Sequence, residues 1–321
     1  MNGCVIAGTE SGVGKLRRTV LPLLMIWTFM VSISALAGAA SRRVRDDLGR
    51  EIMVSDHPHR LICLAPNVAD TVYAIGAGNE VIAVSDFTKY PAEARRKPSV
   101  GLPLSPSWET IVGLHPDLVI GSSDFGGLGI VSQMEQAGIP VFLMNPHGLE
   151  GIYDSVLSLG NALNRKAEAE QEVSRLRRRV AAVQARIKGK ASVRVFMLIW
   201  PEPITTIGKR SFITEIIAAA GGKSITSDLD QEWPNLSFES LVAQAPESIL
   251  LVRGSKMSFD YLAKRPEWSG IVAIRDHRVF YADDRLYSPS PIAVDALESL
   301  ARQFHPGEFH PGGGATPSPK P

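Results

Sequence analysis

One pattern of eleven residues occurs twice in this chain, and it constrains the fold more than any other feature. Ser107–Asp117 and Ser237–Glu247 both begin with serine, an aromatic residue and glutamate, continue as a short amphipathic helix, and end in proline and an acidic residue. The interval from glutamate to proline is seven residues in both copies, and an apolar strand pattern follows each. Such a repeat predicts two similar lobes built from the same succession of elements.

Short apolar segments alternate with helical segments throughout the region that contains the repeat. Strands are predicted over residues 60–64, 81–84, 118–121, 141–144, 193–199, 249–252 and 279–281, and helices over 69–77, 131–137, 211–220 and 292–304. Continuous apolar strands separated by helices indicate parallel sheets that are covered on both faces. The sequence therefore predicts an α/β fold with two Rossmann-like lobes, each with a central, mostly parallel sheet. A length of 321 residues suits two domains.

The lobes, over residues 41–147 and 191–305, are expected to be joined by one long, rigid helix over residues 148–190. Apolar residues recur there at helical spacing, and the charged stretch that follows contains neither proline nor glycine before Gly189. One break, near Asn164, is compatible with the pattern. The arginines of 175–179 are interpreted as a solvated helix face, with an anion site as the alternative. Residues 306–321 are rich in proline and glycine and are expected to form a disordered tail.

Residues 1–40 have the parts of a secretory signal peptide. Lys15, Arg17 and Arg18 precede an apolar run over 20–36, and small residues follow at the spacing of a cleavage site. An uncleaved membrane anchor is the alternative, although the run is short for a span. The preceding residues 5–15 resemble a phosphate-binding loop, but leucine follows the lysine where that loop needs serine or threonine. We interpret them as an extension of the signal peptide.

Composition and motifs exclude several classes of protein. The net charge of +1 gives no basic surface for nucleic acid. Two cysteines, Cys4 and Cys63, are too few for a disulfide framework or a multi-cysteine zinc site, and the seven histidines form no HExxH motif. An enzyme is the alternative to a binding protein, because Asp86 and Asp124 follow predicted strands, where α/β ligand sites form. No GxSxG motif or partner base supports this alternative.

Glu109 and Glu239 occupy the same place in the two copies of the repeat, in the first turn of each predicted helix. A carboxylate near a helix N-terminus is favourable by itself, and this would explain each glutamate separately. The alternative is docking: two related lobes would present two carboxylates to a twofold-symmetric partner, whose arginines could pair with them.

From Arg60 to Phe304 the chain resembles the periplasmic substrate-binding proteins of ABC importers for cobalamin and ferric siderophores. The resemblance is carried by residues 86–94, 108–120, 211–222 and 268–282, in that order. It implies the class III binding-protein fold and a protein, expected to be monomeric and without a cofactor of its own, that works in the periplasm. There it would bind a small molecule and deliver it to a permease dimer in the inner membrane. The resemblance further implies that Glu109 and Glu239 meet arginines of the permease.

Within this family the chain is most similar to the cobalamin-binding members. Tyr90-Pro91, Trp233-Pro234 and Asp283 ahead of Ser288-Pro289 stand at matching places, whereas Leu102-Pro103 replaces a second tryptophan. This implies cobalamin as the ligand, with Tyr90 and Trp233 against the corrin ring and Asp283 accepting from its amides. The expected ligand-binding residues are Pro66, Asn67, Phe87, Tyr90, Trp200, Trp233, Asp283, Arg285 and Tyr287.

Three alternatives remain open at the ligand site. Trp233 could instead pack in the core at the start of a helix, and Tyr90 could cap the turn before Pro91. The ligand could be haem or a ferric siderophore, and for haem His147 and Tyr287 are candidate iron ligands.

Overall fold

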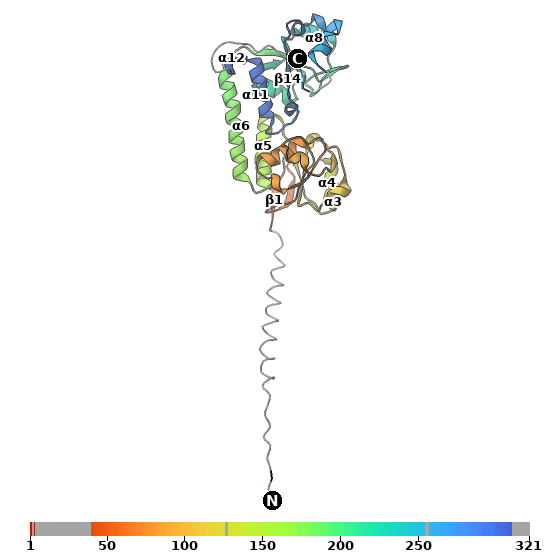
Figure 1. Cartoon of the computed structure of the whole chain (residues 1–321), viewed down its shortest axis with the longest axis vertical. Helices are drawn as coiled ribbons and strands as arrows, with labels where there is room; N and C mark the ends of the chain where they lie inside the picture. The colour runs from red at the N-terminus through yellow and green to blue at the C-terminus, as the bar shows by residue number, and fades with distance from the viewer. Residues whose placement is uncertain (2, 4–39, 126–127, 254–256, 310–321) are drawn as a thin grey trace. The chain divides into compact units, whose positions relative to one another are not determined.

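The computed structural model describes residues 1, 3, 40–125, 128–253 and 257–309, and Figure 1 shows the chain as a cartoon. The expected signal peptide lies almost wholly outside the described residues, as do residues 310–321 of the expected tail. Contacts within the chain divide it into Met1–Arg42 and Arg43–Pro321, and both lobes belong to the second of these units. Among the described residues, no helix combines the length and the apolar character needed to cross a membrane.

The first lobe is built on a four-stranded parallel sheet. Its spatial order is β4 (Val81–Val84), β3 (Leu61–Cys63), β7 (Leu118–Ser122), β8 (Val141–Met144). Nearly every residue of these strands is buried, which confirms the sheet predicted from continuous apolar segments. Two small two-stranded sheets accompany it: β1 (Ser41–Arg45) with β2 (Glu51–Ser55), and β5 (Gly101–Leu102) with β6 (Ser105–Pro106).

The second lobe repeats this topology. Its parallel sheet has the order β12 (Gly222–Ser224), β9 (Val193–Met197), β13 (Ser248–Val252), β14 (Val279–Ala282). In both lobes the second strand of the chain lies beside the first, and the third and fourth follow on the other side. The sequence did not predict β12, because Gly221-Gly222 reads as a helix end. A further pair, β10 (Trp200–Pro201) with β11 (Ile204–Thr205), lies beyond β9.

The two copies of the sequence repeat form equivalent helices, α3 (Trp108–Gly113) and α8 (Phe238–Gln244). The hydroxyl of Ser107 caps the first helix and that of Ser237 caps the second, each accepting from the backbone N–H three residues later. These caps explain why both copies begin with serine.

The C-terminal ends of these helices are matched as well. Arg60 donates to the carbonyl of Leu114 at 2.6 Å, and Arg194 donates to that of Gln244 at 2.5 Å. In each lobe an arginine at the start of the first strand thus satisfies a carbonyl that the helix leaves without an intrahelical partner. The repeat therefore extends to side chains that lie outside the repeated segment.

The connection between the lobes is a pair of helices rather than one. α5 (Gly148–Ala162) and α6 (Lys166–Ile187) lie side by side, and the chain reverses between them. The break falls near Asn164, as anticipated, where the backbone is left-handed with φ of 57°. Gly160 permits the close contact, because a Cβ there would lie 2.3 Å from the Cβ of Ala169. The expectation of a single helix over 148–190 is therefore corrected to two.

The arginines of 175–179 are engaged in ion pairs. Arg175 pairs with Glu172 within α6, and Arg177 pairs with Glu150 of α5. Arg179 contacts Asp295 at 2.6 Å and Glu298 at 2.9 Å, both from α11 (Ala293–Phe304) of the second lobe. These partners favour a helix face tied to its neighbours over an anion site.

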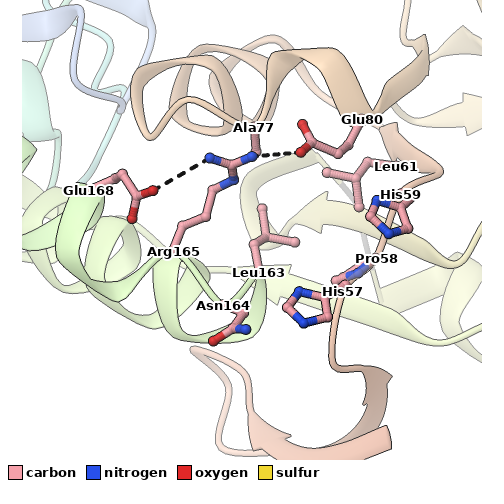
Figure 2. Close-up of a pocket in the computed structure, with 10 residues that line it drawn as sticks. All are labelled: His57, Pro58, His59, Leu61, Ala77, Glu80, Leu163, Asn164, Arg165 and Glu168. Carbon is pink, nitrogen blue, oxygen red and sulfur yellow. Dashed lines mark hydrogen bonds and ion pairs between the residues drawn. The ribbon is translucent and has the colours of Figure 1, made fainter. Parts of the chain in front are cut away.

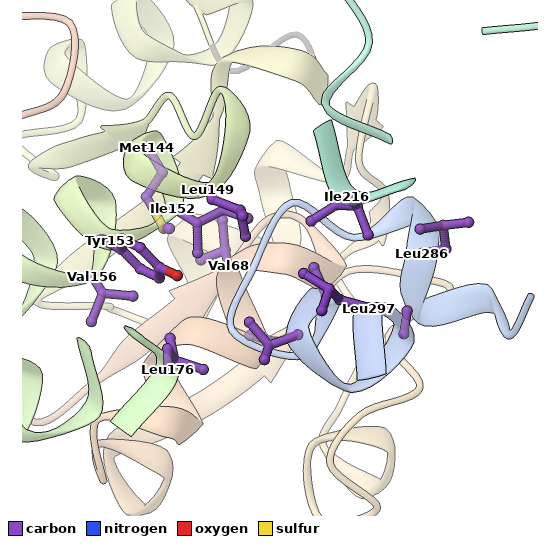
Figure 3. Close-up of a cluster of buried hydrophobic side chains, with 14 of the residues drawn as sticks. Val68, Met144, Leu149, Ile152, Tyr153, Val156, Leu176, Ile216, Leu286 and Leu297 are labelled. Atoms are coloured by element: carbon purple, nitrogen blue, oxygen red, sulfur yellow. The ribbon is translucent and has the colours of Figure 1, made fainter. Parts of the chain in front are cut away.

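One apolar core continues from the first lobe into the second. It includes Val68 of the first lobe, Ile152 and Leu176 of the connecting helices, and Ile216 and Leu297 of the second lobe, all of them buried (Figure 3). Two smaller clusters, one in each lobe, cover the other face of the sheet in that lobe. Helix α6 packs on α5 and also on α7 (Phe212–Ala219) and α11 of the second lobe. The connecting helices are therefore packed into the core of the second lobe.

The remaining helices are short. They are α2 (Pro66–Ala74), α4 (Leu128–Gln136), α9 (Phe259–Ala263), α10 (Val272–Arg275) and α12 (Pro306–Phe309). Pro66 and Asn67, expected in a loop, form the first turn of α2, where proline is well tolerated because its missing N–H is not needed. Residues 306–309, expected in the tail, are helical as α12.

Candidate functional site

A pocket of about 340 Å³ lies where the two lobes meet. Its residues follow the carboxyl ends of β3 and β4 in the first lobe and of β14 in the second, which is where parallel α/β sheets bind ligands. The volume is within the range of small-molecule sites. The lining residues are Pro66, Asn67, Asp70, Phe87, Lys89, Tyr90, Asp284, Arg285, Tyr287, Ser288 and Ile292.

Helix α2 contributes two buried polar side chains to this pocket. Asn67 is 1% exposed, and its Nδ2 donates to the hydroxyl of Ser122 at 3.1 Å. Asp70 is 4% exposed, and its Oδ2 accepts from Ser288 at 2.6 Å and from Ser290 at 3.0 Å. Burial raises the pKa of Asp70 to about 7, although the two serine hydrogen bonds favour the ionised form.

The loop after β4 carries Phe87, Lys89 and Tyr90. Phe87 is exposed and has a left-handed backbone with φ of 65°. The Lys89 ammonium lies 2.5 Å from Asp284 Oδ2, and the Tyr90 hydroxyl donates to Asp284 Oδ1 at 2.9 Å. Burial, together with the neighbouring Asp284 carboxylate, raises the pKa of Tyr90 to about 12. Both contacts join the first lobe to the second across the pocket.

The second lobe supplies the short 3₁₀ helix η5 (Asp284–Tyr287). Asp283 precedes it and binds the guanidinium of Arg285 with both oxygens, at 2.8 and 2.5 Å. Hydrogen bonds from Arg285 outweigh the effect of burial and lower the pKa of Asp283. Arg285 also donates to Asp295 at 3.0 Å, and its guanidinium carbon lies 5.9 Å from the centre of the Tyr90 ring. Burial raises the pKa of Tyr287 to about 12.

The pocket brings together six of the nine expected ligand-binding residues: Pro66, Asn67, Phe87, Tyr90, Arg285 and Tyr287. Trp200, Trp233 and Asp283 do not line it. Trp200 is 61% exposed on β10, and Trp233 is 41% exposed in the turn before α8, so neither is packed in the core. Asp283 instead orients Arg285, because both its oxygens are held by that side chain.

Sequence reasoning missed Asp70, Lys89, Asp284, Ser288 and Ile292, which also line the pocket. One signal was available: Asp70 interrupts the apolar face of Val68, Ala69 and Val72, all of which are fully buried. A carboxylate on such a face needs a partner or a function. His147, the candidate iron ligand, is exposed at the start of α5 and does not line the pocket with Tyr287. Asp86, a candidate carboxylate for an enzyme site, accepts a hydrogen bond from Ser99.

Glu109 and Glu239 lie in the first turns of α3 and α8, as predicted. Both side chains are exposed. Within the described part of the chain, neither carboxylate has a hydrogen bond or ion pair to another side chain. The two lobes therefore display unpaired carboxylates at equivalent positions.

A second, smaller pocket of about 120 Å³ lies between the residues ahead of β3 and the turn that joins α5 to α6 (Figure 2). Arg165 crosses it, contacting Glu80 at 2.6 Å and Glu168 at 3.6 Å, and His57 and His59 stand on one side. The ion pair with Glu80 attaches the helix turn to the first lobe, whereas Glu168 belongs to α6 itself. The described residues contain no group of three or more side chains placed to hold a metal ion.

Comparison with known proteins agrees with this architecture. The sequence profile of a family described as "Periplasmic binding protein" matches residues 61–286. The chain is 27% identical to an uncharacterised ABC transporter substrate-binding lipoprotein, YvrC, of Bacillus subtilis, covering 83% of this chain and 86% of the relative. It is 25% identical to the vitamin B12-binding protein of Vibrio parahaemolyticus, covering 78% and 91%. Among solved structures, the periplasmic haem-binding protein RhuT of Roseiflexus superimposes with a TM-score of 0.70 at 25% identity, covering 78% and 99%.

Proposed function

The chain belongs to the periplasmic binding protein family, and on this premise we propose that it is the exported substrate-binding component of an ABC importer. Its ligand in this proposal is a corrinoid, cobalamin, which binds in the pocket between the lobes. The protein then delivers the ligand to a permease dimer in the inner membrane. Relatives named as binding proteins, rather than enzymes, support this role.

The pocket that combines aromatic and polar side chains from both lobes carries the proposal. Phe87, Tyr90 and Tyr287 offer aromatic faces to a broad apolar ring, and the polar groups between them suit its amide edge. Two carboxylates, Asp70 and Asp284, and two cationic groups line the pocket. When Asp70 is ionised, the formal charges of these groups sum to zero. A ligand that is a neutral ring edged with amides suits a pocket without net charge.

Haem or a ferric siderophore is the second candidate in the same role. A haem-binding relative of the same fold favours it, and so do the Tyr90 and Tyr287 phenols, since tyrosine is a known iron ligand. Haem carries carboxylates, however, and the cations of this pocket already pair with Asp283, Asp284 and Asp295. This difference ranks haem below cobalamin.

Calorimetric titration of the protein purified from the periplasm of an expressing bacterium tests the proposal. Cyanocobalamin, haem and a ferric hydroxamate are compared in the same buffer. We expect one-to-one binding of cyanocobalamin at micromolar or tighter affinity, with no heat from the other two. Binding of haem or of the hydroxamate alone would keep the transport role and reject the corrinoid. Binding of none of the three would reject cobalamin, haem and ferric siderophores as the ligand.

A further inference from the structure

Two acceptor atoms at the wall formed by α2 have no partner in the described protein. Asn67 is 1% exposed, and its Oδ1 is buried without a hydrogen bond. Ser288 and Ser290 both donate to Oδ2 of Asp70, and Oδ1 of that carboxylate receives no hydrogen bond from a described residue. A buried acceptor without a donor is unfavourable, so Asn67 Oδ1 in particular calls for an explanation.

The two side chains form one unit. Asn67 and Asp70 are three residues apart on α2, which places them on the same helix face, and both line the pocket. Their other contacts leave them little freedom: Asn67 is held by Ser122, and Asp70 by the two serines of the second lobe. The positions of the two side chains are therefore fixed before a ligand group binds.

We propose that Asn67 and Asp70 form a subsite for a primary carboxamide on the edge of the ligand. A carboxamide N–H₂ group has two donors, one of which would meet Asp70 Oδ1 and the other Asn67 Oδ1. The inference rests on the proposed ligand pocket and adds to it the chemical group that the pocket selects.

The charges around the subsite favour a carboxamide over a carboxylate. Lys89 lies 2.5 Å from Asp284, and Arg285 is bound by Asp283 and Asp295. A carboxylate on the ligand would therefore find these cations already paired and would be repelled by ionised Asp70. With its pKa near 7, Asp70 is also present in part as the neutral acid, whose O–H can donate a hydrogen bond to the carboxamide carbonyl.

The test compares cyanocobalamin with derivatives in which one side-chain carboxamide has been hydrolysed to a carboxylate. For the full-length wild-type protein we expect at least one derivative to bind about tenfold more weakly than the parent, as the loss of a hydrogen bond to a charged group predicts. In Asp70→Asn the charge repulsion disappears and a donor replaces one acceptor, so this preference should fall below about threefold. Asp46→Asn, which alters a buried carboxylate of the same lobe outside the pocket, should keep the wild-type preference.

The unfolding midpoint of each variant is measured alongside, and Asp70→Ser serves as a second variant without the charge if Asp70→Asn fails to fold. Equal binding of all derivatives by the wild type, or an unchanged preference in the subsite variants, would overturn the proposal while cobalamin binding itself stands. If the wild type binds haem and no corrinoid, the calorimetric titration described above shows that the proposed ligand is wrong. Because haem carries carboxylates instead of carboxamides, that result would overturn the subsite as well.

Discussion

The Tyr90 hydroxyl of the first lobe donates a 2.9 Å hydrogen bond to Asp284 Oδ1 of the second lobe, beside the 2.5 Å ion pair of Lys89 with Oδ2. These contacts span the pocket between the lobes. Lys89, Tyr90 and Asp284 all line the pocket, so a ligand that fills it competes with these contacts for the three side chains. A ligand that displaces these contacts must therefore offset the free energy that they contribute.

Asp284→Ala removes both contacts at once. Because the Lys89 side chain is exposed and the ion pair is correspondingly weak, we expect cobalamin to bind about two- to fivefold more tightly to this variant. Titration calorimetry measures the change. Glu202→Ala, which breaks an exposed ion pair with Arg265 away from the pocket, is the matched control and should leave affinity unaltered. Weaker binding to Asp284→Ala by about tenfold would mean that Asp284 contacts the ligand directly.

The docking hypothesis concerns Glu109 and Glu239. Replacing both with alanine should lower cobalamin uptake by cells about tenfold or more, since truncating one side of a docked charge pair is costly. Affinity for the ligand should stay within about twofold, because neither residue lines the pocket. Uptake and calorimetry together separate the two effects.

Glu135 and Glu267 provide the control for this double variant, as one exposed glutamate from each lobe outside the repeated helices. Their double alanine variant should transport like the wild type. Normal uptake by Glu109→Ala/Glu239→Ala would contradict docking through these carboxylates and leave the helix N-terminus as their explanation.

The shared core predicts a small closing motion. Val68, Leu176 and Leu297 belong to one buried cluster that crosses from lobe to lobe, so a large rotation would have to open packed apolar surface. Small-angle scattering profiles with and without cobalamin should therefore nearly superimpose. A clear decrease in the radius of gyration on binding would indicate a hinge that this packing does not provide.

Asp70 makes stability depend on pH in a defined direction. Its pKa is raised from 3.8 to about 7 in the folded protein, so between these pH values the folded state holds a proton that the unfolded state has lost. The free energy of unfolding contributed by this group therefore falls as pH rises from about 4 to about 7. A shift of about three pKa units corresponds to at most about 4 kcal/mol.

Asp70→Asn removes this linkage. Relative to the wild type, the variant should gain stability progressively from about pH 4 to about pH 8, by up to about 4 kcal/mol. Urea denaturation at several pH values gives the difference directly. A difference that stays constant over this range would show that Asp70 titrates near its ordinary pKa.

Local sequence patterns predicted much of the fold. The alternating apolar segments identified seven strands of the two sheets, and the repeated Ser-aromatic-Glu motif located α3 and α8, since capping and strand burial depend on residues close together in the chain. The position of Asn164 also anticipated the break in the connecting helices. That α5 and α6 fold back on each other depended on the close contact of Gly160 with Ala169, which no single-helix pattern reveals.

The candidate site was predicted less completely. Of the expected ligand-binding residues, Tyr90 and Arg285 line the pocket, whereas Trp200, Trp233 and Asp283 do not. Asp283 and Asp284 are neighbours in the chain, yet only the capping geometry of η5 decides that the first holds Arg285 and the second faces the pocket.

The sequence alone determined the α/β class, the duplication of the lobes and the two equivalent glutamates, because these depend on periodicity and capping within short segments. Tertiary structure alone decided which charged groups of the pocket are already paired. Asp70 meets Ser288 and Ser290, and Lys89 meets Asp284, only because the lobes pack together across about two hundred residues of chain. Burial and pairing between such distant residues depend on that packing, and they set the charge that a ligand encounters.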